Sequence, residues 1–366
     1  MTENPSLRRV RITSPDEMTQ IIPYLIGFTP EESLVIAVID QGVVAVTARV
    51  DIGDVQPQGQ AELLLDRMWA RFPGADAYMV AYTADPPAGW ALLERCADHL
   101  AAGVARQTMV VDGDTWHLAD GTSGPADRFG PLAAEASFFG LQRLPSRSEL
   151  VASFASPPDT DELTDKVEAA LDKLPQPDEI PAIITRMGEL VRRNLPTTSA
   201  EQVAPFRVEV EDAVQLAVLA QHPKAREVAM LSMTRADAKD HLAMWRTVVN
   251  NVPEYGAEAP LFLAGMAAWV AGEGAAASIA LDRTLEVGEP GQYPPARLLG
   301  ELIDQVVPPS AWVALRTDGL ANANPLVRDA VISGHTPAVW ESIPQHPIRQ
   351  RPQPPDVAPP APGIAI

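Results

Sequence analysis

The chain shows two kinds of hydrophobic pattern, and the change between them falls near Pro157 and Pro158. In the first half, short apolar and β-branched runs alternate with segments whose apolar residues recur every three or four positions, as they do in helices. After the two prolines the strand patterns vanish, and helical patterns separated by proline or glycine follow one another. The sequence therefore predicts an α/β domain over residues 1–156 and an all-helical domain over residues 157–335.

Residues 23–51 contain the clearest local signals. Residues 29–32, Thr-Pro-Glu-Glu, match a capping box with proline at the first helical position, which predicts a short turn of helix. Residues 34–39 form an apolar run without polar alternation, which is typical of a strand covered on both faces. A turn signal at residues 40–42 and a second β-rich run at residues 43–50 complete a predicted hairpin.

From the second strand of the hairpin onward, the hydrophobic pattern predicts a strand, a helix, a strand, a helix and a strand in turn. Because crossovers through a helix align strands in parallel, we expect the last three strands to be mostly parallel, with the hairpin adding an antiparallel element. The predicted architecture is a mixed sheet with helices on both faces. The helices of this half are expected at residues 15–26, 61–72 and 86–102, and the strands after the hairpin at 77–82, 107–111 and, as an edge hairpin, 115–118.

The second half predicts helices only. They are expected at residues 160–174, 179–194, 205–220, 225–233, 235–250, 260–272, 275–286 and 295–306. Residues 260–286 form a predicted αα-hairpin that turns at Gly272 and Gly274, and this pairing resembles tetratricopeptide helix pairs. No clean period repeats along the half, so a true solenoid stays open. Residues 336–366, with nine prolines and few apolar anchors, predict a disordered tail.

Charge narrows the classes of partner. With 28 basic and 48 acidic residues the formal net charge is −20, which repels nucleic-acid phosphates and anionic lipid surfaces. We therefore expect no nucleic acid and no membrane among the partners. No apolar run approaches the ~18 residues that span a bilayer, and no signal-type apolar run follows the first arginines. We expect a cytoplasmic protein.

The single cysteine, Cys96, excludes an intrachain disulfide and a thiolate metal cluster. It lies in a helical pattern, so we interpret it as a small buried core residue rather than a reactive thiol. The six histidines are scattered without metal-ligand spacing, and no phosphate-binding, dinucleotide-binding, zinc-protease or nucleophile-elbow motif occurs. We expect no metal and no cofactor.

Three segments carry a family resemblance. They are GFTPEESLVIAVID near the start, PLAAEASFFGLQRLPSRSEL in the middle, and WVAGEGAAASIALDRTL followed by QYPPARLL near the end. As a set they resemble DUF4192, an actinobacterial family of unknown function, over roughly residues 12–315. The resemblance implies a cytoplasmic protein of actinobacterial or actinophage origin. It implies no particular activity, substrate or cofactor.

A polar cluster around residues 119–131 is the first candidate site. A Gly-, Pro- and Asp-rich loop of this length in a compact domain is more often functional or mobile than a mere connection. The residues of the cluster are His117, Asp120, Asp127, Arg128, Glu135, Arg143 and Arg147. In a ligand site at the sheet edge, Asp127 or His117 would be the general base and Arg128 or Arg147 the anion clamp. The alternative is a solvated loop whose aspartates make turns and whose arginines pair with nearby acids.

Two further candidates have strong structural alternatives. A helix start at residues 29–33 could bind an anion or hold a metal, but the capping box explains Thr29 and Glu32, and the carboxylates repel phosphate. In the helical half, Trp and Arg are favoured interface anchors, and the candidate interface residues are Arg235, Asp237, His241, Trp245 and Arg246. The alternative is a capped helix whose Trp245 packs inward.

The functional interpretation that the sequence favours is a non-enzymatic, cytoplasmic protein-interaction or regulatory protein that binds its partner through the helical half. The alternative is a small-ligand sensor or an enzyme with a pocket under the loop of residues 119–131. The sequence leaves the oligomeric state open.

Overall fold

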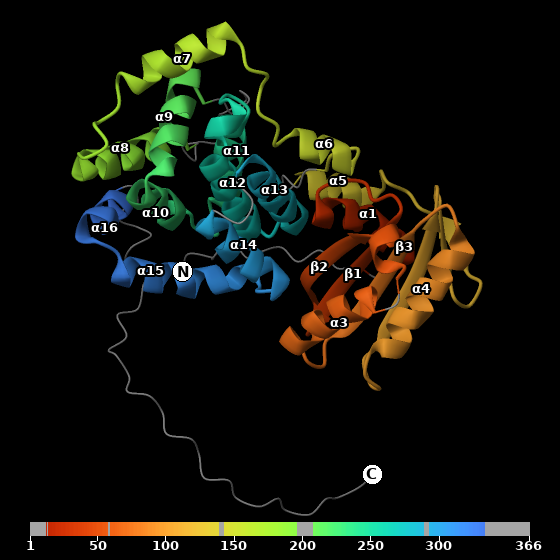
Figure 1. Cartoon of the computed structure of the whole chain (residues 1–366). Helices are drawn as coiled ribbons and strands as arrows, with labels where there is room; N and C mark the ends of the chain where they lie inside the picture. The colour runs from red at the N-terminus through yellow and green to blue at the C-terminus, as the bar shows by residue number, and fades with distance from the viewer. Residues whose placement is uncertain are drawn as a thin grey trace, which may run out of the picture.

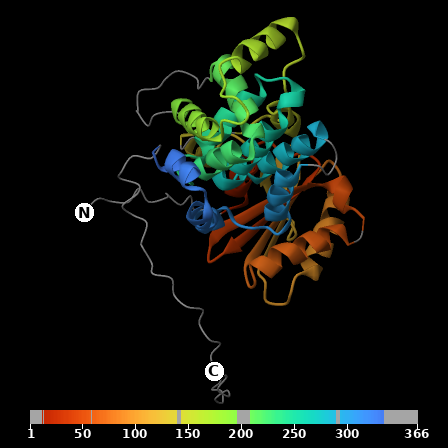
Figure 2. The same ribbon diagram turned by 60° about the vertical axis from the view of Figure 1, so that its left-hand side comes forward.

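The computed structural model describes residues 12, 14–57, 59–138, 143–195, 208–288 and 293–333 of the chain. A six-stranded sheet and its helices form one side of the molecule, and helices alone form the other (Figure 1). A view turned by 60° again shows the helical half against the sheet (Figure 2). The predicted tail, residues 336–366, lies outside the described residues.

The sheet is mixed, as predicted, with the strand order β2-β1-β3-β4-β5-β6. The strands are β1 (Ser33–Asp40), β2 (Val43–Asp51), β3 (Asp76–Tyr82), β4 (Arg106–Asp112), β5 (Thr115–Leu118) and β6 (Ser123–Pro125). Strand β1 runs antiparallel to both of its neighbours, β2 and β3, whereas β3 and β4 are parallel. Strands β2, β3 and β4 therefore share one direction, with β1 reversed between the first two. Strands β4, β5 and β6 form an antiparallel meander.

Strand β1 is buried on both faces because its run of apolar residues has no polar alternation. Leu34 and Ile36 face the helices α2 to α4, while Val35 and Ala37 face α1 and the helical half. The helices of this part are α1 (Pro15–Ile26), α2 (Ile52–Val55), α3 (Gln60–Arg71) and α4 (Pro86–His99). Helices cover both faces of the sheet, as the sequence predicted.

The rest of the described chain is helical. The α-helices are α5 (Pro131–Phe138), α6 (Arg147–Ala152), α7 (Asp161–Leu171), α8 (Ile180–Arg193), α9 (Val210–Gln221), α10 (Pro223–Ser232), α11 (Ala238–Val249), α12 (Glu258–Ala271), α13 (Gly274–Val287), α14 (Pro294–Asp304), α15 (Trp312–Asn322) and α16 (Pro325–Ile332). Two short 3₁₀ helices, η1 (Glu254–Gly256) and η2 (Pro309–Ala311), lie between them.

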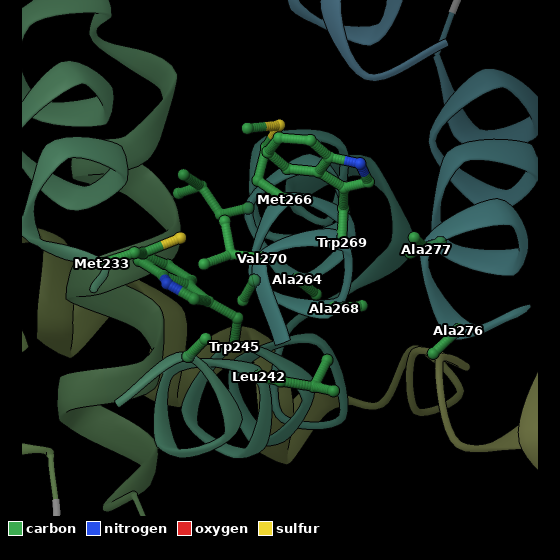
Figure 3. Packing of buried hydrophobic residues seen from close by; sticks show 14 of the residues in the cluster. Met233, Leu242, Trp245, Ala264, Met266, Ala268, Trp269, Val270, Ala276 and Ala277 are labelled. Atoms are coloured by element: carbon green, nitrogen blue, oxygen red, sulfur yellow. The ribbon is translucent and has the colours of Figure 1, made fainter. Parts of the chain in front are cut away.

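Helix α12 is the centre of the helical half. It is buried along nearly its whole length and contacts both α11 and α13, as expected for a helix that is apolar all round. The indoles of Trp269 on α12 and Trp312 on α15 meet edge to face, with ring centroids 6.2 Å apart. Trp245 of α11 packs near Met233 and Val270 (Figure 3). Helix α12 turns into α13 at Gly272, whose φ of +86° favours glycine.

One hydrophobic core runs across the predicted domain boundary. Val35 of β1, Phe154 before the two prolines and Trp245 of α11 all belong to a single buried cluster. Helix α13 also contacts β2 and α6. The division into separately folding domains stays a prediction, and the shared cluster indicates that the two halves stabilise each other.

Two local predictions need correction. Residues 29–32 form no helix: the chain bends at Glu31 and Glu32 instead of making the predicted turn of helix, and Glu32 has a φ of +40°. The Glu32 carboxylate accepts hydrogen bonds from the Thr83 hydroxyl at 3.0 Å and the Ala84 backbone N–H at 2.9 Å. These distant partners replace the local N–H groups that a capping box would satisfy. The loop of residues 119–131, in turn, contains strand β6, which pairs with β5.

Cys96 is completely buried against the sheet, which confirms the interpretation of this residue as part of the core. Burial raises the pKa of its thiol to about 11, so the thiol stays protonated well above neutral pH. We expect iodoacetamide at pH 8 to alkylate the native protein at least about 100-fold more slowly than the urea-unfolded protein, as measured by mass spectrometry. Stoichiometric alkylation of the native protein within minutes would contradict a closed core.

Within the part of the chain that the structure describes, none of the helices has the length and apolar character needed to cross a bilayer.

Candidate functional site

Two of the three family-like segments meet at the start of β1. Phe28 and Leu144 form an isolated parallel bridge. The Thr29 N–H donates to the Leu144 carbonyl at 3.1 Å, and the Leu144 N–H donates to the Gly27 carbonyl at 2.8 Å. This pairing fixes the chain before α6 against the chain that enters the sheet.

Arg49 of β2 also stabilises the chain at the start of β1. Its guanidinium lies 5.5 Å from the centre of the Phe28 ring, and its Nε donates to the Ser33 hydroxyl at 2.8 Å. Its Nη2 donates to the Asp51 carboxylate at 2.7 Å, and only 9% of the Arg49 side chain is exposed. A buried charge with these partners holds the Phe28 ring on the sheet.

The third segment reaches the same junction through α13, which contacts both β2 and α6. Partial burial raises the pKa of Asp282 on α13, and the positive charge of Arg147 on α6 partly offsets this rise. The three segments therefore meet where the sheet joins the helical half. The contacts that join them are backbone hydrogen bonds and packing contacts, which gives the junction a structural role.

The predicted loop residues make mostly local contacts. His117 is half-buried in β5, paired with Val110, which belongs to the core on the α4 side of the sheet. Asp120 and Asp127 are exposed, and each accepts the backbone N–H two residues ahead, at 2.8 and 2.9 Å. The hydrogen bond from Thr122 lowers the pKa of Asp120. These are turn-forming contacts of aspartate.

Arg128 contacts the neighbouring turn. Its Nη2 donates to the Gly113 carbonyl at 3.3 Å and lies 3.6 Å from the Asp114 carboxylate. Arg147 lies apart, on α6, and is exposed. His117, Arg128 and Arg147 therefore belong to three different segments, and no hydrogen bond or ion pair joins them among the described residues. The acid-base and clamp roles that the sequence suggested remain a prediction.

The loop packs closely onto the structure beneath it. A Cβ atom at Gly124 would lie 2.5 Å from the Trp116 ring, and one at Gly130 would lie 2.4 Å from the Gln20 amide. The Gln20 amide oxygen accepts the Leu132 N–H at 3.0 Å, and the Trp116 indole N–H donates to the Asp16 carboxylate. These contacts fill the space between the loop, β5 and α1 at both glycines.

An exposed aromatic surface lies beside this loop. The Arg143 guanidinium stacks on both Tyr24 and Phe129, 5.4 and 5.0 Å from the ring centres. The Tyr24 hydroxyl is 2.9 Å from the hydroxyl of Ser137, the residue before Phe138. Phe129 is 83% exposed and Phe138 84%. We call Tyr24, Phe129, Phe138 and Arg143 the aromatic patch.

Two of the predicted site residues belong to this region. Arg143 is part of the aromatic patch, and Glu135 is exposed on α5, one turn before Phe138. Sequence reasoning missed Phe129 and Phe138. A signal was present: Phe129 stands alone in a polar loop, and Phe138 lies in a helix with no clear apolar face.

A protein-family model describing a domain of unknown function, DUF4192, matches residues 15–310. The chain belongs to the DUF4192 family. The match includes the junction and the whole aromatic patch, and it ends within η2, before α15 and α16. Neither the comparison with curated proteins nor the comparison with solved structures found a match.

The predicted interface on α11 of this DUF4192 protein points mostly inward. His241 and Trp245 are fully buried, and Arg246 stacks on the Phe154 ring, 4.7 Å from its centre. Asp237 accepts the Thr234 N–H at 2.6 Å, at the start of the helix. Arg235 is exposed, so a partner on this side would meet Arg235 rather than His241 or Trp245.

Two cavities of the DUF4192 protein lie elsewhere. An open cavity of about 870 Å³ lies among α7, α8 and α9, where the nearly buried Asp212 accepts hydrogen bonds from Arg193 and Asn194. A second cavity, of about 220 Å³, lies between residues 155–159 and Arg283. Neither is lined by a residue of the loop 119–131.

Proposed function

We propose that this DUF4192 protein works by binding a protein partner through the aromatic patch. The observation that carries the proposal is the nearly complete exposure of two phenylalanines: Phe129 stacks on an arginine that also stacks on Tyr24, and Phe138 follows the serine that the Tyr24 hydroxyl contacts. Aromatic residues and arginine are enriched in protein interfaces and among the residues that dominate binding energy. Burial of one phenylalanine side chain contributes about 1.5–3 kcal/mol, so two such rings can anchor a partner.

Contacts within the protein already position part of the aromatic patch, which reduces the conformational entropy that is lost when a partner binds. Arg143 holds Phe129 and Tyr24 in place through its two stacking contacts. The start of α5 is tied to α1 by the hydrogen bond between Leu132 and Gln20. Side chains that are already positioned lose less conformational entropy on association.

The family resemblance and the net charge suggest where the protein works and which kind of partner it binds. We place the protein in the cytoplasm of an actinobacterium or of a cell infected by an actinophage, in line with the family resemblance. A net charge of −20 favours a partner with basic residues over a nucleic acid. The helical half, with tetratricopeptide-like pairing as the expected arrangement, would serve as the scaffold that holds the junction.

The double substitution Phe129→Ser and Phe138→Ser tests the proposal. The matched control is Tyr255→Ser with Val313→Ser, which removes apolar side chains that are 72% and 61% exposed on η1 and α15. A protein captured from native lysate by the wild-type chain should bind the patch variant at least about 10-fold more weakly in a direct titration, because both anchors are lost.

The control variant should retain wild-type affinity, and both variants should keep the wild-type circular dichroism spectrum. Equal affinity of the partner for the wild type and the patch variant would contradict the proposal.

A further inference from the structure

We propose that in the free protein the aromatic patch is occupied by the chain's own proline-rich tail, with residues 349–355 as the docking segment. This inference rests on the patch of the proposed function and names its regulation: the tail is an internal competitor that a partner must displace. Residues 349–355 read Arg-Gln-Arg-Pro-Gln-Pro-Pro and lie in the part of the sequence with nine prolines between residues 336 and 366.

The spacing of the segment matches an aromatic surface. A polyproline II helix has three residues per turn and a rise of about 3.1 Å per residue, so in that conformation positions 349, 352 and 355 would share one face, about 9 Å apart. Proline-rich segments in this conformation dock on aromatic-lined surfaces at a low entropy cost. Phe129, Phe138 and Tyr24 supply aromatic rings of this kind in the described structure.

Charge favours the same contact. The docking segment contains Arg349 and Arg351, two positive charges in a chain whose net charge is −20. Two exposed carboxylates are close in sequence to the phenylalanines of the patch: Asp127 is two residues before Phe129, and Glu135 is three residues before Phe138 on α5. Opposite charges at the rim of an interface orient the two surfaces and accelerate their association.

The tail is long enough to reach the patch. The described chain ends at Ser333, and residues 334–348, fifteen in number, separate it from Arg349. An extended segment of this length spans about 50 Å. A folded body of this size has a radius of gyration of about 20 Å, so the length of the segment is comparable to the diameter of the body.

Tethering makes even weak docking effective. A segment joined to its site by a short linker acts at an effective concentration in the millimolar range. A partner from outside can therefore bind only those chains whose patch is free of the tail. Its apparent affinity is its intrinsic affinity multiplied by the fraction of chains with a free patch.

A synthetic peptide of residues 336–366 with a fluorescent label, titrated by anisotropy, tests the proposal. The full chain carrying Arg349→Glu, Pro352→Ala and Pro355→Ala should bind the peptide at least about 10-fold more tightly than the wild-type full chain, because its own tail no longer competes. Adding Phe129→Ser and Phe138→Ser should abolish this binding, whereas adding Tyr255→Ser and Val313→Ser should leave it unchanged.

Peptide affinity that is equal for the wild-type and tail-substituted chains, or that is unaffected by the loss of Phe129 and Phe138, would overturn the tail proposal. The two proposals fail separately. If the patch variant loses its partner while the peptide does not bind, the tail proposal is wrong and the proposed function stands. If the peptide binds the patch but no partner depends on it, the proposed function is wrong and the tail docking stands.

Discussion

Replacing Phe28 with alanine should lower the free energy of unfolding by about 3–5 kcal/mol, the usual effect of removing a buried phenylalanine. The ring is buried in the core that joins the two halves, and its face carries the Arg49 guanidinium at 5.5 Å. The variant therefore loses apolar contacts and a cation–π contact, and it leaves the Arg49 charge beside a cavity. Urea unfolding followed by circular dichroism measures the loss.

The substitution Phe28→Leu is the matched control, because it keeps most of the apolar volume and removes only the ring. We expect it to cost less than about 1.5 kcal/mol from packing plus the cation–π contribution. A double-mutant cycle with Arg49→Met should then show a coupling of about 0.5–2 kcal/mol between the two side chains. A loss below about 1 kcal/mol for Phe28→Ala would show that Phe28 does not hold the junction together.

Trp245 should respond differently to two substitutions. Trp245→Ala should cost about 3–5 kcal/mol, because the indole is fully buried between α11 and its neighbours. Trp245→Phe should cost far less, because the Trp245 indole N–H is buried without a hydrogen-bond partner among the described residues. Its removal relieves an unsatisfied buried donor, which offsets part of the lost contact area.

Trp312→Phe provides the comparison. The Trp312 indole N–H donates to the Met233 carbonyl at 2.9 Å, so the phenylalanine variant loses a hydrogen bond and leaves a buried acceptor unpaired. We expect Trp312→Phe to cost about 1–3 kcal/mol more than Trp245→Phe in the same unfolding assay. Equal losses for the two phenylalanine variants would mean that the Trp245 N–H has a partner, such as an internal water.

The sheet shows which structural features the local sequence pattern can predict and which it cannot. The two-faced burial of β1 follows from its uninterrupted apolar run, and the turn at residues 40–42 follows from its Asp-Gln-Gly sequence. The place of β1 between β2 and β3 depends on which strands pair, and no local signal encodes that choice. The capping box at residues 29–32 misled for a similar reason, because the true partners of Glu32 are Thr83 and Ala84, far along the chain.

The candidate sites show a second limit. The chemical types of His117, Arg128 and Arg147 could be read from the sequence, but only tertiary structure shows what surrounds them: His117 pairs across the sheet with Val110, Arg128 contacts the turn at Gly113, and Arg147 lies on α6. The charged residues around Trp245 suggested a surface helix, whereas the tertiary structure buries the indole completely. Exposure of an aromatic residue such as Phe129 likewise depends on what packs around it.

Strand β2 ends the sheet, and α13 lies against it. A free outer strand presents unpaired N–H and C=O groups on which another molecule can add a strand, and a long β-branched strand is the most prone to such pairing. Nine residues long and rich in valine, β2 is a strand of that kind. We therefore expect a fragment cut after Ser156, which lacks α13, to aggregate through β2 more readily than the whole protein.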